Sequence, residues 1–166
     1  MGIDIKDRDK VEKKLWDEIG AHNGTVMLGA HTHPMQHFQP MTAFHEKDTG
    51  QVWFFTRTDT DLAQSIQEGK PAMMVVQGTK FQACVSGQLT LQHDPARIDK
   101  YWGPVVAAWY PEGKDDPKLT MLCLDAEDAQ VWLNEAGPVK FAWEIAKANA
   151  TGTTPDLGGS RRLDLN

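Results

Sequence analysis

Cysteine is scarce in this sequence, and long apolar runs are absent. Only Cys84 and Cys123 occur in 166 residues, each inside an apolar, strand-like segment. This setting is typical of buried free thiols in a reducing compartment, so no disulfide framework is expected. The charged N-terminus has no apolar core of the signal-peptide type, and no later run is long enough to span a bilayer. We therefore expect a cytoplasmic location and no membrane partner.

Positive charge is also in short supply. The formal net charge is −6 and the pI is about 5.4. The pairs Lys13-Lys14 and Arg161-Arg162 are too short to form a basic patch. Because nucleic-acid affinity rests on cations that displace phosphate counterions, no nucleic-acid partner is expected.

Patterns for side-chain catalysis or metal binding are missing as well. Ser65 and Ser86 have no histidine at the spacing of a serine hydrolase motif. His31 and His33 would share one face of a strand, but Pro34 follows them, and no Cys, Asp or Glu stands nearby at ligand spacing. We therefore interpret His31, His33, His37 and His45 as loop histidines and expect no metal site.

The most informative stretch runs from Phe38 to Ile66. Two apolar, β-favouring runs, Phe38–Phe44 and 52–56, flank a polar link, which predicts a hairpin. A threonine-rich turn, residues 56–60, then opens a segment of helical period. A strand that ends in such a turn offers free N–H groups and hydroxyls, so it is a candidate seat for an anion.

The rest of the chain is predicted as short strands with helices inserted between them. We expect a helix over residues 7–19, strands over 25–30, 72–77, 81–92 and 119–125, and short helices over 62–68, 95–102 and 105–109. Gly87 predicts a bulge inside its strand, and Asp94 followed by Pro95 predicts a capped helix start. Segments 126–134 and 140–148 fit a helix or an extended chain equally well. The absence of regular strand–helix alternation favours a mainly β, small antiparallel barrel.

Several sequence blocks resemble the pyridoxamine-phosphate-oxidase-like flavoproteins, and within them the general stress protein 26 group. They are the Pro-Met strand, the WFFT strand end with its following helix, and then segments 81–87, 101–102, 107–117 and 131–133, all in the family's order. The resemblance implies a six-stranded split barrel. It also implies a single domain over residues 1–166, with an N-terminal helix in 1–20 and an extended C-terminal tail over 149–166.

By this resemblance, a flavin would lie at a homodimer interface against two stretches of the chain and two further residues. The implied cofactor-binding residues are Gln39, Pro40, Met41, Thr42, Phe55, Thr56, Arg57, Thr58, Thr60, Asp61, Leu62, Gln82 and Trp109. For Trp109, two places stay open: the protein's own packing, or the cofactor across the dimer interface.

The phosphate site departs from the family pattern. The oxidase relatives carry an arginine where Gln39 stands, and two basic residues where Asp61 and Leu62 stand. Charge-assisted bonds to phosphate are about twice as strong as neutral ones, so this loss should cost several kcal/mol unless it is replaced. Arg57 is the nearest candidate replacement.

Two functional hypotheses follow. The first is a stress-related, flavin-dependent oxidoreductase that holds FMN, or FAD as the alternative, with NAD(P)H as a candidate electron donor. The second is a module that stores or senses a flavin or another small ligand without turnover. The C-terminal Arg-x-His pattern of the oxidase relatives is absent, so oxidation of pyridoxamine phosphate is not expected.

Overall fold

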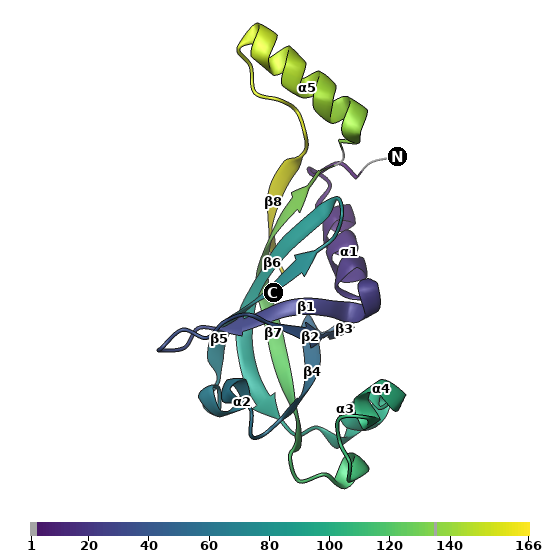
Figure 1. The fold of residues 1–166 in the computed structure, drawn as a ribbon, viewed down its shortest axis with the longest axis vertical. Helices are drawn as coiled ribbons and strands as arrows, with labels where there is room; N and C mark the ends of the chain where they lie inside the picture. The colour runs from purple at the N-terminus through teal and green to yellow at the C-terminus, as the bar shows by residue number, and fades with distance from the viewer. Residues whose placement is uncertain (1–2, 135) are drawn as a thin grey trace.

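A computed structural model describes residues 3–134 and 136–166, and its centre is one curled antiparallel sheet, a half-barrel (Figure 1). Within the described residues the sheet has eight strands, whereas six were expected, and five α-helices accompany it, so the fold is mixed and strand-rich and not mainly β as predicted. In sheet order they are β2 (Gln39–Thr42), β1 (Thr25–Ala30), β5 (Lys70–Gln77), β6 (Phe81–Gln92), β7 (Leu119–Leu133), β4 (Gln51–Arg57) and β3 (Phe44–Glu46), with β8 (Gly159–Asp164) beside β7.

The predicted hairpin is only half right. Its second half exists, because β3 pairs with β4 in a register that sets Phe44 opposite Trp53. The first apolar run does not pair with β4 as predicted, because its strand β2 pairs with β1 at the other edge of the sheet. The chain changes strands at the buried Ala43, whose N–H donates to the carbonyl of Gly24 at 2.7 Å. One continuous segment thus supplies both edge strands, which draws the two edges toward each other.

The longest strands are β6 and β7. The bounds of β6 match the prediction, and its pairing with β7 shifts register between Ser86 and Gly87, which confirms the predicted bulge. β7 runs on to Leu133, past the predicted end at Asp125, so the undecided segment 126–134 is extended. Opposite the bulge the alternation of buried residues is interrupted between Ala126 and Ala129, and the apolar Trp132 is exposed, which explains why neither period dominated in the sequence.

Helix α1 (Arg8–Ile19) covers the inner face of the sheet. Val11, Leu15 and Ile19 lie at helical spacing and are fully buried in the main core. The shorter helices are α2 (Asp61–Ser65), α3 (Pro95–Tyr101), α4 (Pro104–Ala107) and the 3₁₀ turns η1 (His22–Gly24) and η2 (Gly113–Asp115). Asp94 caps α3 as predicted, by accepting from the N–H of Arg97 at 3.0 Å.

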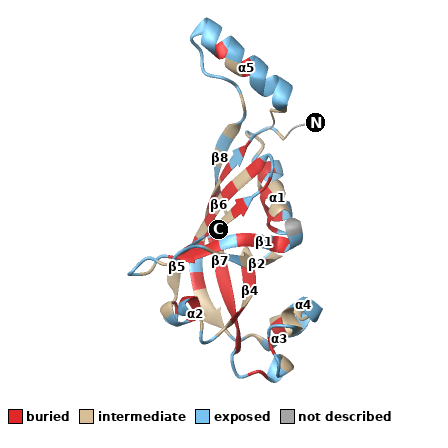
Figure 2. Ribbon diagram, in the orientation of Figure 1, coloured by how far each residue is buried: buried red, intermediate tan, exposed pale blue. Residues whose placement is uncertain are grey.

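The C-terminal part differs from the predicted extended tail. Segment 140–148 lies inside a helix, α5 (Pro138–Thr151), and this helix ends at Gly152, which has a left-handed conformation with φ +68°. The chain then returns as β8, which pairs with β7 from Asp128 to Leu133. Helix α5 stands apart from the rest of the molecule, and most of its surface is exposed (Figure 2). No helix within the described ranges is both long and apolar enough to cross a membrane.

Candidate functional site

A cleft of ≈ 600 Å³ lies where the loop before β2 meets the start of α2. Three of the predicted cofactor residues, Gln39, Asp61 and Leu62, line it together with Ser65 and loop residues 32–38. The amide Nε2 of Gln36 donates to the carbonyl of Asp61 at 3.2 Å and so links the loop to the helix. The sequence segments singled out for a ligand therefore do meet around one concave site.

A second hollow, of ≈ 390 Å³, lies on the other side of the same loop. It is lined by Gly29, Phe38, Met73 and the bulge at Gly87, and it shares Met35, Gln36 and Phe38 with the first cleft. The ring of Phe38 sits over Gly29, where even a Cβ would come within 3.0 Å of it. The loop is thus a wall between a polar cleft and a more apolar hollow.

Strand β2 forms one side of the cleft. Gln39 and Met41 are half-buried and share one face, whereas Pro40 and Thr42 alternate with them and are exposed. Proline has no N–H to donate, so it is tolerated on an edge strand such as this one. The alternation leaves the amide of Gln39 at the mouth of the cleft, in the position where the oxidase relatives place a cation.

The threonine corner after β4 (residues 56–60) is already hydrogen-bonded within the chain. The hydroxyl of Thr60 donates to the carbonyl of Arg57 at 3.0 Å and accepts from the N–H of Ala63 at 3.2 Å, as the N-cap of α2. The Thr56 hydroxyl lies 3.3 Å from that of Thr60. Thr58 is exposed and donates its N–H to the carbonyl of Lys118. Because α2 spans five residues and begins with Asp61, the anion seat predicted at its start is weaker than expected.

Tyr110 stabilises the threonine corner through a hydrogen bond to its backbone. Its hydroxyl donates to the carbonyl of Thr56 at 2.9 Å, and burial raises the pKa of Tyr110 to about 12, so the donor proton is retained. Phe55 and Trp102 pack around its ring, with centroids 6.4 and 6.0 Å away. The end of β4 is therefore held rigidly by aromatic packing.

The charges at the corner form a clamp centred on Asp59. Arg57 donates to both carboxylate oxygens of Asp59, at 3.1 and 3.2 Å, and the Lys118 amine lies 2.9 Å away. Hydrogen bonds from Arg57 and then Lys118 lower the pKa of Asp59 to about 2. Two cations share Asp59, and the nearby Asp116 carboxylate also acts on Arg57, so the corner carries little surplus positive charge. Arg57, the candidate replacement for the missing cations, is thus already paired.

The two remaining predicted residues lie away from the cleft. Trp109 follows α4 and is 71% exposed. Gln82 lies opposite Trp132 on β7, whereas Thr56 lies opposite Thr120. Twelve residues of extended strand separate these positions, about 40 Å along β7 at ~3.3 Å per residue. Within one chain, Gln82 therefore does not join the threonine corner, and its amide donates to the carbonyl of Gly78 at 3.0 Å.

Of the histidines predicted to lie in loops, His31, His33 and His37 do so, whereas His45 lies in β3 and stacks on the ring of Trp16, with centroids 6.1 Å apart. His33 and His37 both line the cleft, but among residues 3–134 and 136–166 no group of three or more His, Cys, Asp or Glu side chains is placed to hold a metal ion. The residues that sequence reasoning missed at this site are Gln36, Lys118 and Tyr110. Their contacts span 25, 59 and 54 positions of sequence, so no local pattern could have identified them.

The site fits a flavin in part. The cleft falls in the size range of small-molecule sites, but most of its lining residues are polar, whereas such sites are mainly apolar with a few polar groups. The phosphate of a flavin is the part that the site fits least well. Leu62, which stands where the oxidase relatives have a cation, is 2% exposed and belongs to the core. Phosphate oxygens would have to share Arg57 and Lys118 with Asp59. The apolar side chains of the site thus suit the flavin ring better than its charged side chains suit the flavin phosphate.

Comparison with known proteins identifies the family of this chain. The model of the family described as pyridoxamine 5'-phosphate oxidase like matches residues 9–156. General stress protein 26 of Bacillus subtilis (strain 168) is 26% identical over 131 residues, which cover 73% of this chain and 87% of that protein.

Two solved structures extend the comparison. One, assigned as a general stress protein 26 of Jannaschia sp. CCS1, has a TM-score of 0.75 and 29% identity and covers 94% of this chain and 99% of its own. The general stress FMN/FAD binding protein of Xanthomonas citri has a TM-score of 0.70 and 40% identity and covers 78% of this chain and 92% of its own. This chain belongs to the pyridoxamine 5'-phosphate oxidase-like family and, within it, to the general stress protein 26 group.

Proposed function

We propose that this protein binds a flavin, FMN with FAD as the alternative, in a groove between two copies of the chain. The observation that carries the proposal is the ≈ 600 Å³ cleft, where Gln39 meets Asp61 and Leu62 from a separate segment of the chain; both segments are ones that the family resemblance implies for the cofactor. The 40% identity with a general stress FMN/FAD binding protein supports the choice of ligand.

The second copy is part of the proposal because one chain does not complete the site. Gln82 and the exposed Trp109 lie away from the cleft, so a neighbouring copy would have to bring them to a flavin held at the corner. In that arrangement Gln39 would contribute an amide, the clamp its two cations, and Trp109 an aromatic surface.

A bound flavin would supply the redox chemistry, and the chain would position the ring and keep water from it. On this basis we propose an oxidoreductase with NAD(P)H as the candidate electron donor. The competing proposal, a flavin or small-ligand store or sensor without turnover, is favoured by the pairing of Arg57 with Asp59, which weakens the phosphate site.

Absorbance of the purified protein tests the proposal directly. A flavoprotein absorbs light at about 450 nm. Bleaching by NAD(P)H and recovery in air would support the oxidoreductase, whereas absorbance that NAD(P)H leaves unchanged would support the store or sensor. A colourless protein that takes up neither FMN nor FAD would exclude flavin binding altogether.

We expect Asp59→Asn to tighten FMN binding about tenfold. The substitution removes the anion that holds Arg57 and Lys118, so both cations become free to meet a phosphate, and charge-assisted bonds of this kind exceed neutral ones by roughly 1.4 kcal/mol or more. The measurement is a fluorescence titration with FMN and, in parallel, with riboflavin, which has no phosphate.

The matched control is Asp48→Asn, which removes one exposed carboxylate from the hairpin link and should leave both affinities unchanged. An equal change for FMN and riboflavin would place the phosphate away from the clamp. In the same assay Gln39→Arg should strengthen FMN binding, since it adds a cation at the mouth of the cleft. Leu62→Lys is a poorer test, because the lysine would replace a core side chain.

A further inference from the structure

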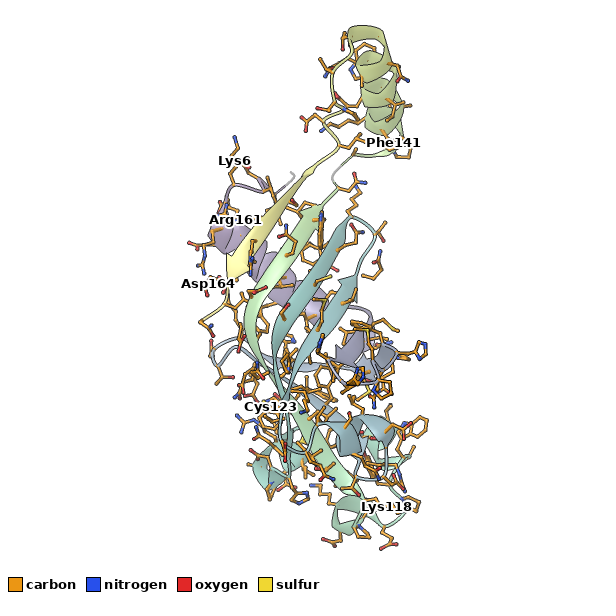
Figure 3. The ribbon with its side chains drawn as sticks, turned by 90° about the vertical axis from the view of Figure 1, so that its left-hand side faces the viewer. Lys6, Lys118, Cys123, Phe141, Arg161 and Asp164 are labelled. Carbon is orange, nitrogen blue, oxygen red and sulfur yellow. The ribbon has the colours of Figure 1, made fainter. Side chains whose placement is uncertain are left out.

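Helix α5 projects from the molecule as an arm and makes few contacts with the rest of its own chain. Its buried contacts are on one side: Glu144 is 7% exposed and Ala148 9%. Glu144 accepts from the Lys147 amine at 3.1 Å and from the N–H of Asp156 at 3.0 Å, which ties the helix to the returning segment before β8. Figure 3, a view turned by 90° from that of Figure 1, also shows the helix outside the body, with Phe141 at its first turn.

The opposite side of α5 is an exposed apolar stripe. Its members recur at helical spacing and are all exposed; they are Val139, Ala142, Trp143, Ala146 and Ala150. Val139 is 85% exposed and Trp143 66%. The helix therefore turns a carboxylate toward its own chain and an apolar face toward solvent, the reverse of an ordinary surface helix. Since a 14-residue helix is marginal on its own in water, this stripe is expected to be covered.

A second uncovered apolar surface lies on the outer face of the sheet. Met27 and Met73 are each 38% exposed and Trp132 is 42% exposed. The register places all three on one face, since Met27 lies opposite Val75, two residues from Met73, and Trp132 lies opposite Gln82, which pairs with Gln77. Helix α1 packs on the other face, with Val26 and Leu28. The ≈ 390 Å³ hollow opens on this outer face.

The total exposed area indicates how much surface a partner would bury. The chain exposes 9844 Å², whereas a compact monomer of 18.5 kDa exposes about 8,200 Å². The excess, about 1,600 Å², exceeds the ~800 Å² that each partner buries in a standard stable interface. An interface between two copies would account for it.

We propose that α5 packs, through the stripe, on the outer sheet face of a second copy, and that the second copy returns the same contact. This inference rests on the homodimer in the proposed function and names its surface. One contact covers both apolar surfaces, and a two-fold axis makes it self-complementary. The charges also agree, because the exposed Lys140 flanks the stripe and Glu127 lines the hollow.

Sedimentation velocity on the full chain tests whether α5 contributes to the contact between two copies. The wild type is expected to be a dimer, and Val139→Gln with Trp143→Gln should raise its dissociation constant by about 30-fold or more, as expected for a central aromatic contact. Lys140→Gln, on the same helix, removes only the charge beside the stripe and should raise the dissociation constant by no more than about fivefold, as expected for an exposed ion pair. Since the replaced side chains are exposed, the core is untouched, and circular dichroism should still show a folded protein, with at most the loss of signal from α5.

Cross-linking identifies the surface that α5 meets. In a Cys84→Ser background, a bismaleimide should join Ala146→Cys chains to Met73→Cys chains when the two are mixed, and should join few chains in either variant alone. Efficient cross-linking of Ala146→Cys alone would mean that two α5 helices pair with each other, which would overturn the inference.

The outcomes separate this inference from the proposed function. A dimer that the stripe variants leave intact would overturn the arm contact and leave the homodimer standing. A monomeric wild type would overturn both. Flavin binding, read from absorbance and FMN titration of the same samples, is tested independently of either result.

Discussion

Replacing Gly87 with alanine is expected to destabilise the protein by about 3 kcal/mol, near the upper end for overpacking. A Cβ at this position would overlap the carbonyl oxygen of Asp125 and come within 2.8 Å of its carbon. Both atoms belong to the backbone of β7, which cannot move aside as a flexible side chain would. Relief would require a new register between β6 and β7, the two longest strands of the sheet.

Thermal unfolding gives the simplest measurement. For a protein of this size, 1 kcal/mol corresponds to roughly 2–4 °C in Tm, so the expected decrease is about 6–12 °C. Gly103→Ala is the matched control, because nothing lies within 4 Å of its Cβ position, and its effect should stay within about 1 kcal/mol. A similar loss for both variants would mean that the close approach at the bulge is not the cause.

The second large effect is expected at Glu46, where Glu46→Gln should cost about 2–3 kcal/mol at pH 7. The carboxylate is 12% exposed and accepts from Tyr101 at 2.8 Å, from Lys100 at 3.1 Å and from Arg97 at 3.1 Å. Burial opposes its ionisation, but these three hydrogen bonds outweigh burial and lower the pKa of Glu46 from 4.5 to about 2. A shift of this size corresponds to roughly 3 kcal/mol.

The sign of the pH dependence follows from the direction of this shift. Because the folded pKa is below the unfolded one, the stabilisation is present above about pH 4.5 and is lost as the pH falls toward about 2. Urea unfolding of the wild type should show this loss, and Glu46→Gln should remove it from the pH profile. Glu68→Gln, an exposed glutamate, should keep the wild-type profile. Identical profiles for all three proteins would contradict the network's role.

Glu46 also connects stability to the proposed site. Arg97 bridges Glu46 and Asp94 and lies 4.3 Å over the ring of Trp53, so the network anchors α3 to the sheet. Helix α4 and Trp109 follow α3 directly in the chain. We therefore expect Glu46→Gln to loosen the segment of α3, α4 and Trp109, which limited proteolysis of the variant and the wild type would report as faster cleavage in this segment.

Elements with strong local signals were predicted well. The strands β1 and β6 have the predicted bounds, and the cap at Asp94 and the bulge at Gly87 are where the sequence indicated. These features depend on side-chain alternation, on a cap three residues from its donor, or on a glycine that allows close approach, and each acts within a few residues. The family was predicted correctly for a related reason, since its blocks occur in order along the chain.

The candidate site was predicted less completely. The sequence placed Gln39, Asp61 and Leu62 among the ligand residues, and the fold brings these three to one cleft. It did not indicate that Asp59 pairs with Arg57 and Lys118, because the contact with Lys118 depends on the meeting of two distant loops. Whether Gln82 and Trp109 belong to the same site depends on a second copy, which no pattern within one chain specifies.

The sequence by itself determined the antiparallel strands, the family and the composition of the phosphate corner, because these depend on residue types and their local spacing. Only the tertiary structure decided that Phe38–Phe44 divides at Ala43 between the two edges of the sheet, and that the C-terminal segment forms an arm and an eighth strand. Strand pairing and burial arise between residues far apart in the chain. A segment that fits a helix or a strand equally well takes the form that its distant partners stabilise.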